Sequence, residues 1–250
     1  MKVSVITVSY NARATIRDAI ESVLSQDYTD IEYIVVDGAS RDGTAEIIRQ
    51  YGDRIDHYVS QPDHGIYDAM NKAVKLATGD LVGFLNADDM FADESCVRRV
   101  ADAAATTGCE VVLGDVQIVH PEQTGRTIRF YTARGFGRHW IEQGDMPPHP
   151  GMYVRRAVFE RYGDFDLQFR TSSDFDFVAR ILYVHNLAYR LLPYTLVKMR
   201  HGGRSTALPF GPFRTLRDVY RACQKNRIPV TPLKLASKYV RKLGQFFIQN

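Results

Sequence analysis

Four short apolar runs alternate with helix-like segments over the first 86 residues, and this alternation most constrains the fold. The runs "VSVITV" (3–8), "IEYIVVD" (31–37), "DHYVSQ" (56–61) and "DLVGFLN" (80–86) are typical of strands. In the intervening segment 11–26, Ile16, Ile20 and Val23 recur at helical spacing, and segments 40–51 and 65–79 are predicted as further helices. Strands and helices that alternate with short connections indicate an α/β layered sheet with mostly parallel strands.

Polar side chains follow each of the four predicted strands. They are Ser9, Tyr10 and Asn11, then Asp37, then Gln61 and Asp63, and finally Asn86, Asp88 and Asp89. Ligands of parallel α/β sheets bind beyond the carboxyl ends of the strands. The acidic stretch "DDMFADES" is also compatible with the first turn of a helix. Four polar clusters at one edge favour a binding or active site over a helix start.

The residue types at this edge indicate a metal and a diphosphate. Adjacent carboxylates on a loop suit a hard divalent cation, and Mg²⁺ in proteins is usually held by one or two carboxylates together with substrate phosphates. The sequence lacks a G-x-x-x-x-G-K-[ST] phosphate loop, and "GFGRHW" (135–140) lacks the third glycine of a dinucleotide fingerprint. The H-E-x-x-H and G-x-S-x-G motifs are also absent, which disfavours a metalloprotease or an α/β-hydrolase.

Composition indicates an ordinary globular protein without a disulfide framework. Hydrophobic residues make up 45% and charged residues 24% of the chain. Three cysteines without a C-x-x-C pair favour a reducing compartment. We find no secretory signal pattern and no run near the ~18 apolar residues of a spanning helix. The expected location is cytoplasmic.

The second half of the chain has a looser pattern and ends in a basic segment. Residues 116–131 read as a hairpin that turns at 122–125, and residues 172–186 read as a helix with Ser172 or Ser173 as N-cap. From Arg214 onward nine basic residues accompany one acidic residue, a net charge of +8, so residues 1–213 carry −5 of the total +3. Two basic amphipathic helices are expected there, separated by "IPVTP".

Five of these stretches, in order, resemble glycosyltransferase family 2. They are "VSVITVSYNA", "YIVVDGASRDGT", "SQPDHGIYDAMNKAVKLATGD", "VGFLNADD" and, more weakly, "TSSDFDF". The resemblance covers about residues 1–205 and is nearest to the bacterial exopolysaccharide branch of the colanic acid type. It implies the GT-A fold, Rossmann-like with a mostly parallel central sheet flanked by helices. It also implies a nucleotide-sugar-binding half (1–115), an acceptor-side half (116–205) and a C-terminal helical extension (206–250).

The resemblance assigns roles on the donor side. Tyr10 is expected to pack on the nucleotide base, and Asp37 to accept a hydrogen bond from it. The family's next aspartate is replaced by Gly38, which leaves the choice between UDP and GDP open. Asp88 is expected to bind the metal and the diphosphate, with Asp89 as its partner. Asn86 stands where the family's metal-binding D-x-D motif has its first aspartate. His201 is a candidate third metal ligand.

Further positions follow from the same resemblance. Asp174 falls where the family supplies a catalytic base, with Ser173 in place of the usual glutamate and Asp176 as the fallback. His149 aligns with a polar acceptor-side position. Asp63, Asn71 and Lys72 are expected to edge the nucleotide pocket, although a helix start and a solvated helix face would also explain them. Asp42, Gly43 and Thr44 fit a helix-opening turn better than a ligand contact.

The resulting hypothesis is an inverting, metal-assisted hexosyl transfer in polysaccharide biosynthesis. The donor is a UDP- or GDP-sugar, the cofactor Mg²⁺ or Mn²⁺, and the acceptor a glycan or polyprenyl-linked glycan. Residues 230–250 form a basic amphipathic helix that is expected to bind an anionic membrane surface at the inner face of the cell membrane, although packing on the catalytic domain is the alternative. No nucleic-acid partner is expected. The alternatives are a non-catalytic nucleotide-sugar-binding protein and a sugar-phosphate nucleotidyltransferase.

Overall fold

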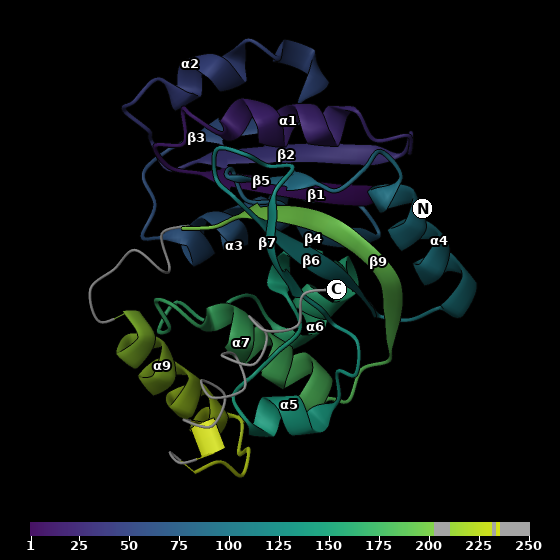
Figure 1. The fold of residues 1–250 in the computed structure, drawn as a ribbon, viewed down its shortest axis with the longest axis vertical. Helices are drawn as coiled ribbons and strands as arrows, with labels where there is room; N and C mark the ends of the chain where they lie inside the picture. The colour runs from purple at the N-terminus through teal and green to yellow at the C-terminus, as the bar shows by residue number, and fades with distance from the viewer. Residues whose placement is uncertain (203–210, 232–233, 236–250) are drawn as a thin grey trace.

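The computed structural model describes residues 1–202, 211–231 and 234–235 of the 250-residue chain. Its first half contains the four predicted strands: β1 (Val3–Ser9), β2 (Ile31–Asp37), β3 (His57–Ser60) and β4 (Leu81–Phe84). They lie in the order β3-β2-β1-β4 and all pair in parallel. In Figure 1 the helices α1 (Ile16–Leu24) and α2 (Thr44–Arg49) lie on one side of these strands and α3 (Ile66–Leu76) on the other. A short 3-10 helix, η1 (Gly52–Arg54), leads into β3.

The second half of the chain extends the same sheet. β8 (Met152–Arg155) pairs antiparallel with β4 and with β6 (Val111–Val119), and β9 (Tyr189–Arg200) runs parallel to β6. The edge strand β5 (Asp89–Phe91) pairs antiparallel with β9. The predicted hairpin is present, because β7 (Thr127–Tyr131) returns along β6. The predicted α/β class, a sheet flanked by helices, is confirmed, and the later strands of the sheet are mixed in direction.

The acidic pair does not open a helix. Asp89 is the first residue of β5, and the next helix, α4 (Cys96–Thr107), begins seven residues later. The helix-start reading of "DDMFADES" is therefore wrong at Asp88 and Asp89, because residues 89–91 are extended to pair with β9.

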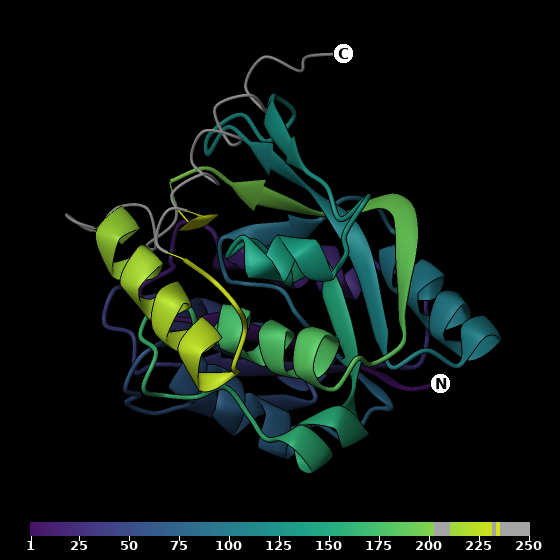
Figure 2. The same ribbon diagram turned by 90° about the horizontal axis from the view of Figure 1, so that it is seen from below.

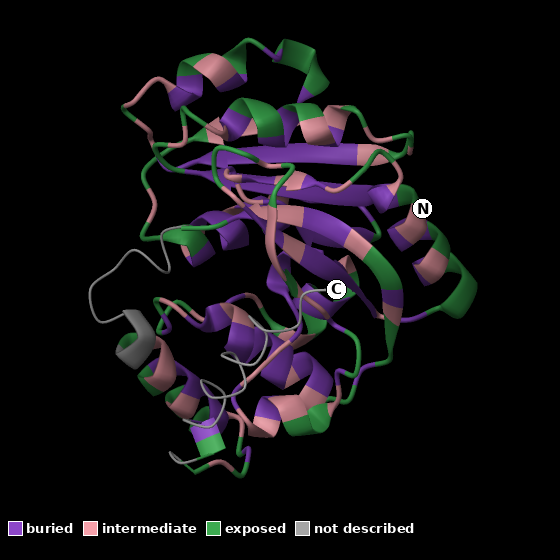
Figure 3. Ribbon diagram, in the orientation of Figure 1, coloured by how far each residue is buried: buried purple, intermediate pink, exposed green. Residues whose placement is uncertain are grey.

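A layer of short helices covers the face of the sheet on which α3 lies. It consists of α5 (Arg138–Glu142), η2 (His149–Gly151), α6 (Arg156–Tyr162), α7 (Ser173–Val178) with its π-helical continuation η3 (Ala179–Val184), and α9 (Gly211–Lys225). Figure 2 shows α9 beside α7. Strands β1, β2, β4 and β6 and the inner sides of the helices are mostly buried (Figure 3).

Helix α9 is packed into the main core. Its residues Val219, Ala222 and Cys223 are buried in one hydrophobic cluster with Phe175 and Phe177 of α7. Leu235 is also buried in this cluster. Within the described residues, the predicted extension beyond residue 205 therefore packs through α9 and Leu235 into the same core as α7. Most of the second basic helix (230–250) lies outside the described residues. None of the described helices has the length and apolarity to cross a membrane.

Candidate functional site

The carboxyl ends of β1, β2 and β3 are tied together by Asp37. Its buried carboxylate accepts hydrogen bonds from Ser9 Oγ (3.0 Å), Ser60 Oγ (2.7 Å), and both the backbone N (2.9 Å) and the Oγ of Ser40. Ser9 and Ser60 are register partners of Asp37 in the neighbouring strands. The carboxylate was predicted to accept a hydrogen bond from a base, and in this structure protein donors occupy both of its oxygens. Asp37 therefore fixes the loops that line the site.

Gly38 stands where the family motif has its second aspartate, and the space beside it is filled by other side chains. A Cβ at position 38 would collide with Oδ2 of Asp63 and would lie 3.1 Å from the Tyr10 ring. The Asp63 carboxylate therefore occupies the space where the side chain of residue 38 would be. Gly65 N donates to Asp63 Oδ1 (2.8 Å), and the Tyr10 ring is 45% exposed. Tyr10, Gly38 and Asp63 form one surface at the edge of the sheet.

We predict that Gly38→Ala weakens nucleotide binding by about tenfold, equivalent to about 1.4 kcal/mol. The added methyl group must displace the Asp63 carboxylate or the Tyr10 ring. Titration calorimetry of the variant against the parent measures the change. Gly125→Ala is the matched control, because no atom lies within 4 Å of a Cβ at that hairpin position. Equal affinity in Gly38→Ala and the parent would contradict a nucleotide site at this surface.

Asn71 and Lys72, which are predicted to edge the nucleotide pocket, lie on α3 and contact protein groups in this structure. Asn71 is buried, its Nδ2 donates to Phe165 O (2.9 Å), and its Oδ1 accepts from Phe165 N (3.0 Å). This amide holds the backbone of a distant loop in place. Lys72 donates to Pro62 O (3.0 Å) and pairs with Asp68 (3.0 Å), so it braces the loop that carries Asp63.

The loop after β4 brings together Asn86, Asp88 and Asp89. Asn86 Nδ2 donates to Asp89 Oδ2 (3.1 Å), and Asp89 N donates to Asn86 O (3.0 Å). Asp89 is buried in β5, whereas Asp88 is half-buried. Burial raises the pKa of Asp88; burial and the charge of Asp88 raise the pKa of Asp89 well above its usual value. The structure thus separates the pair into a more accessible carboxyl and an enclosed one.

This loop fits a divalent cation by its chemistry. Asn86 Oδ1 and Asp89 Oδ1 are both buried without a hydrogen-bond donor among the described residues. Uncompensated buried oxygens are unfavourable, and oxygen ligands are those that Mg²⁺ and related cations prefer. No group of three or more His, Cys, Asp or Glu side chains in the described part of the chain could hold a metal by itself. His201 is exposed, and the predicted set of Asp88, Asp89 and His201 is not among such groups in the described residues.

Arg200 is a functional candidate that the sequence reasoning missed. Its guanidinium is buried at the end of β9 and donates to Asp88 O (2.9 Å) and Pro121 O (3.2 Å), and it pairs with Asp18. The positive charge of Arg200 opposes the rise in the pKa of both Asp88 and Asp89. Arg200 and Asp88 are separated by 112 positions in sequence, and only the pairing of β9 with β5 brings them together.

Asp174 and Tyr67 meet on the helical side of the site. Tyr67 Oη donates to Asp174 Oδ1 (2.9 Å), and Phe175 N also donates to Oδ1 (2.8 Å). Burial and the nearby Asp174 charge raise the pKa of Tyr67 well above its usual value, so the phenol keeps its proton. The described residues give Asp174 Oδ2 no hydrogen bond. That oxygen is suited to accept a proton from a ligand.

His149 lies between this acid and the loop after β4. Its ring stacks on Phe84 (centroids 5.4 Å apart) and contacts the edge of Phe165 (5.7 Å). Its Nε2 atom is buried without a partner among the described residues. Burial lowers the pKa of His149, although the Asp174 charge acts in the opposite direction, so the imidazole is neutral near pH 7. Because Phe84 precedes Asn86 by two residues, the acidic loop and the Asp174 side are neighbours.

The architecture and the acidic loop at the carboxyl edge define a GT-A protein. The family model "Glycosyl transferase family 2" matches residues 4–163, and the chain belongs to this family. The chain is 27% identical over 254 residues to an uncharacterized glycosyltransferase of Mycobacterium tuberculosis, covering 99% of this chain and 93% of that protein. It is 29% identical over 181 residues to a PGL/p-HBAD biosynthesis glycosyltransferase of the same species, covering 71% and 68%.

Two solved structures share the fold. Staphylococcus aureus TarS residues 1–349, in complex with UDP-GlcNAc, superimposes with a TM-score of 0.71 at 22% identity, over 89% of this chain and 66% of that one. The mannosyltransferase PcManGT of Pyrobaculum calidifontis, in complex with GDP-Man and Mn²⁺, gives a TM-score of 0.67 at 18% identity, over 93% and 67%. These two likenesses concern the fold.

Proposed function

We propose that this chain is an inverting glycosyltransferase that moves a hexosyl group from a UDP- or GDP-sugar to a hydroxyl of a glycan or polyprenyl-linked glycan. One observation supports the proposal most directly. The Phe84 ring, two residues before the acidic loop that is suited to a diphosphate, contacts the Phe165 ring. Phe165 in turn contacts Tyr67, whose hydroxyl holds the Asp174 carboxylate that is suited to a base. The relatives in solved structures hold UDP-GlcNAc and GDP-Man, which supports a nucleotide-sugar donor. Bacterial polysaccharide synthesis, of the exopolysaccharide or colanic acid type, is the setting that we propose.

The donor is held at the carboxyl edge of the sheet. Tyr10 and Asp63 face the base from the loops after β1 and β3, and Asp37 keeps these loops in place. Asn86, Asp88 and Asp89 would hold the divalent metal. The metal would supply positive charge that stabilises the departing diphosphate. Arg200 fixes the Asp88 backbone and adds a permanent positive charge beside it.

The base acts on the other side of the anomeric carbon. Tyr67 holds Asp174 Oδ1, which leaves Oδ2 to take the proton of the acceptor hydroxyl. As the acceptor oxygen bonds to the anomeric carbon, the bond between that carbon and the diphosphate oxygen breaks, and its electron pair leaves with the nucleoside diphosphate. His149 Nε2 is available for a hydrogen bond from an acceptor hydroxyl. A single displacement from the opposite face inverts the configuration.

A panel of nucleoside diphosphates tests this function. Thermal unfolding is measured with UDP, GDP, CDP and dTDP, each with and without Mg²⁺ or Mn²⁺, followed by release of nucleoside diphosphate from the matching sugar nucleotide. We expect UDP or GDP to raise the Tm only with metal. Absence of any metal-dependent shift would contradict the proposal. Binding without turnover on any acceptor would instead favour a non-catalytic sugar-nucleotide-binding protein. Turnover of the sugar nucleotide that depends on pyrophosphate would favour a nucleotidyltransferase.

We further propose peripheral attachment of this enzyme to an anionic membrane surface. Arg214, Arg217 and Arg221 are exposed and recur at helical spacing on α9, opposite the buried face of that helix. The remaining tail, residues 236–250, adds Lys238, Arg241 and Lys242. Each basic residue near anionic lipid contributes roughly 1 kcal/mol.

We predict sedimentation of the full chain with anionic vesicles at low salt and no sedimentation with neutral ones. Truncation should begin at residue 236, because Leu235 is buried in the core. Truncation together with Arg214→Gln, Arg217→Gln and Arg221→Gln is expected to abolish binding. If the full chain stays in the supernatant with anionic vesicles, the basic residues only solvate the surface of the protein.

A further inference from the structure

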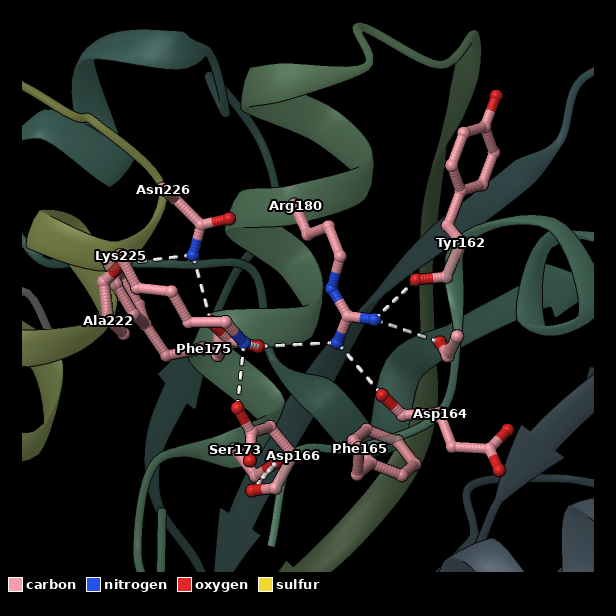
Figure 4. A network of polar contacts seen from close by, with 12 residues as sticks. Tyr162, Asp164, Phe165, Asp166, Ser173, Phe175, Arg180, Ala222, Lys225 and Asn226 are labelled. Carbon is pink, nitrogen blue, oxygen red and sulfur yellow. Dashed lines mark hydrogen bonds and ion pairs between the residues drawn. The ribbon is translucent and has the colours of Figure 1, made fainter. Parts of the chain in front are cut away.

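Asp176 is a fully buried carboxylate on α7, two residues after Asp174. It accepts hydrogen bonds from Arg180 (3.2 Å), Lys225 Nζ (3.0 Å) and Asn226 Nδ2 (2.8 Å). Figure 4 shows Lys225 and Asn226 reaching from the end of α9 toward this helix. A buried charge is strongly unfavourable unless charged and hydrogen-bonding groups surround it. Two of its three donors therefore tie α7 to α9.

The same donors hold the loop between α6 and α7. Lys225 Nζ also pairs with Asp166 Oδ2 (2.8 Å), and Ser173 Oγ donates to Asp166 O (2.9 Å). Arg180 donates to the carbonyls of Tyr162 and Asp164 (Figure 4). The end of α6, the following loop, α7 and the end of α9 are thus joined in one polar network.

This network is connected to the proposed acceptor side through Phe165. The Phe165 ring lies 5.7 Å from the ring of Tyr67 and 5.7 Å from that of His149, between centroids. Its neighbours in sequence, Asp164 and Asp166, are both held by the network. The ring that contacts the partner of the base therefore belongs to a loop that Lys225 and Arg180 fix.

Asp174 and Asp176 point in opposite directions from the same helix. Successive residues of an α-helix are rotated by about 100°, so residues two apart differ by about 200°. The partners of Asp176 therefore do not contact Asp174 directly, and they act on it by fixing α7 and the loop that carries Phe165. A base must be held within a fraction of an ångström of its productive position, and a misplacement of 1 Å costs about 10²-fold in rate.

We infer that Lys225 and Asn226 are positioning residues for the base: by holding Asp176 they set the orientation of α7 and of Asp174. This inference rests on the proposed function, because it takes Asp174 as the base. Neither residue touches the Tyr67–Asp174 pair. Packing of α9 alone would need only its apolar face, whereas the contacts of Lys225 and Asn226 with the buried Asp176 carboxylate fix α7 in one orientation.

The test compares Lys225→Met with the parent. Methionine keeps the apolar stem of lysine and removes the ammonium group. We expect at least a tenfold lower kcat for donor hydrolysis or transfer, with nucleotide affinity, measured calorimetrically, within twofold of the parent. Lys75→Met, at an exposed position in the last turn of α3, is the matched control and should leave kcat unchanged. An unchanged kcat in Lys225→Met would overturn the inference.

A double variant separates positioning from stability. Asp176→Asn, added to Lys225→Met, replaces the buried carboxylate by a neutral amide, so that no buried charge is left without its ammonium partner. We therefore expect the Tm to recover relative to Lys225→Met while kcat stays low. Recovery of kcat together with Tm would mean that the network only stabilises the fold. If the parent shows no turnover, which contradicts the proposed function, hydrogen exchange of residues 173–178 still decides. Faster exchange in Lys225→Met supports the inference, and identical exchange overturns it.

Discussion

Replacing Asp88 by alanine should abolish metal-dependent nucleotide binding and reduce turnover by at least ~10³-fold. Asp88 is the more accessible carboxyl of the acidic loop, and it lies next to two buried oxygens that lack donors among the described residues. Loss of its carboxylate removes the charge that would hold a divalent cation against a diphosphate. Calorimetry with the nucleoside diphosphate, with and without Mn²⁺, and assays of nucleoside diphosphate release measure the two effects.

Two further variants make the Asp88 experiment specific. Asp102→Ala removes an exposed carboxylate on α4 and should behave like the parent. Asp89→Asn replaces the enclosed carboxyl by an amide of the same shape. If nucleoside diphosphate binding by this variant still depends on the metal, Asp89 has a structural role. If Asp88→Ala binds nucleoside diphosphate with the metal dependence of the parent, the acidic loop is not the metal site.

The sheet and the gathering of polar residues at one of its edges could be predicted from the sequence because both depend on local patterns. β-branched runs of the right length specify strands, and parallel pairing brings the polar residues after each strand to one edge. Ser9 and Asp37 are in register for this reason. The hairpin of β6 and β7 follows from alternation around a turn, which is also a local signal.

The contacts of individual side chains could not be predicted, since they join distant segments. Tyr67 and Asp174 are 107 positions apart, and Arg200 and Asp88 are 112 apart. Asn71 looks like a polar residue on a helix that edges the site, yet its amide holds Phe165 from 94 positions away. The family motif marks Asp37 as a residue that contacts the base, but only the structure shows that four protein donors already surround it.

The two acids of "SSDFDF" illustrate the same limit. A helix places Asp174 and Asp176 on different faces, but sequence alone does not say which face lines the site. The structure places Asp176 among Arg180, Lys225 and Asn226, where no oxygen is left for an acceptor. It places Asp174 against Tyr67, with Oδ2 available. The fallback assignment of Asp176 as the base is therefore wrong, because its carboxylate is enclosed by protein donors.

Replacing Asp174 by asparagine should keep donor binding and lower transfer by at least ~10²-fold. The amide has nearly the volume of the carboxylate and its oxygen can still accept from Tyr67, so α7 and the Phe165 loop stay in place. The amide cannot take up a proton, so the acceptor hydroxyl must attack without base assistance. Initial rates at saturating donor, with calorimetric donor affinity and Tm for each variant, separate these effects.

Tyr67→Phe provides a graded comparison for the Asp174 variant. It keeps the carboxylate but removes the hydroxyl that orients it, so we expect a loss of about tenfold, smaller than that of Asp174→Asn. Asp164→Asn is the same chemical change in the preceding loop. Asp164 contacts Arg180 through its backbone carbonyl, so this variant should have the transfer rate of the parent. Equal transfer rates in Asp174→Asn and the parent, with the donor bound, would exclude Asp174 as the base. His149, whose buried Nε2 has no partner among the described residues, would then be the next candidate for the base.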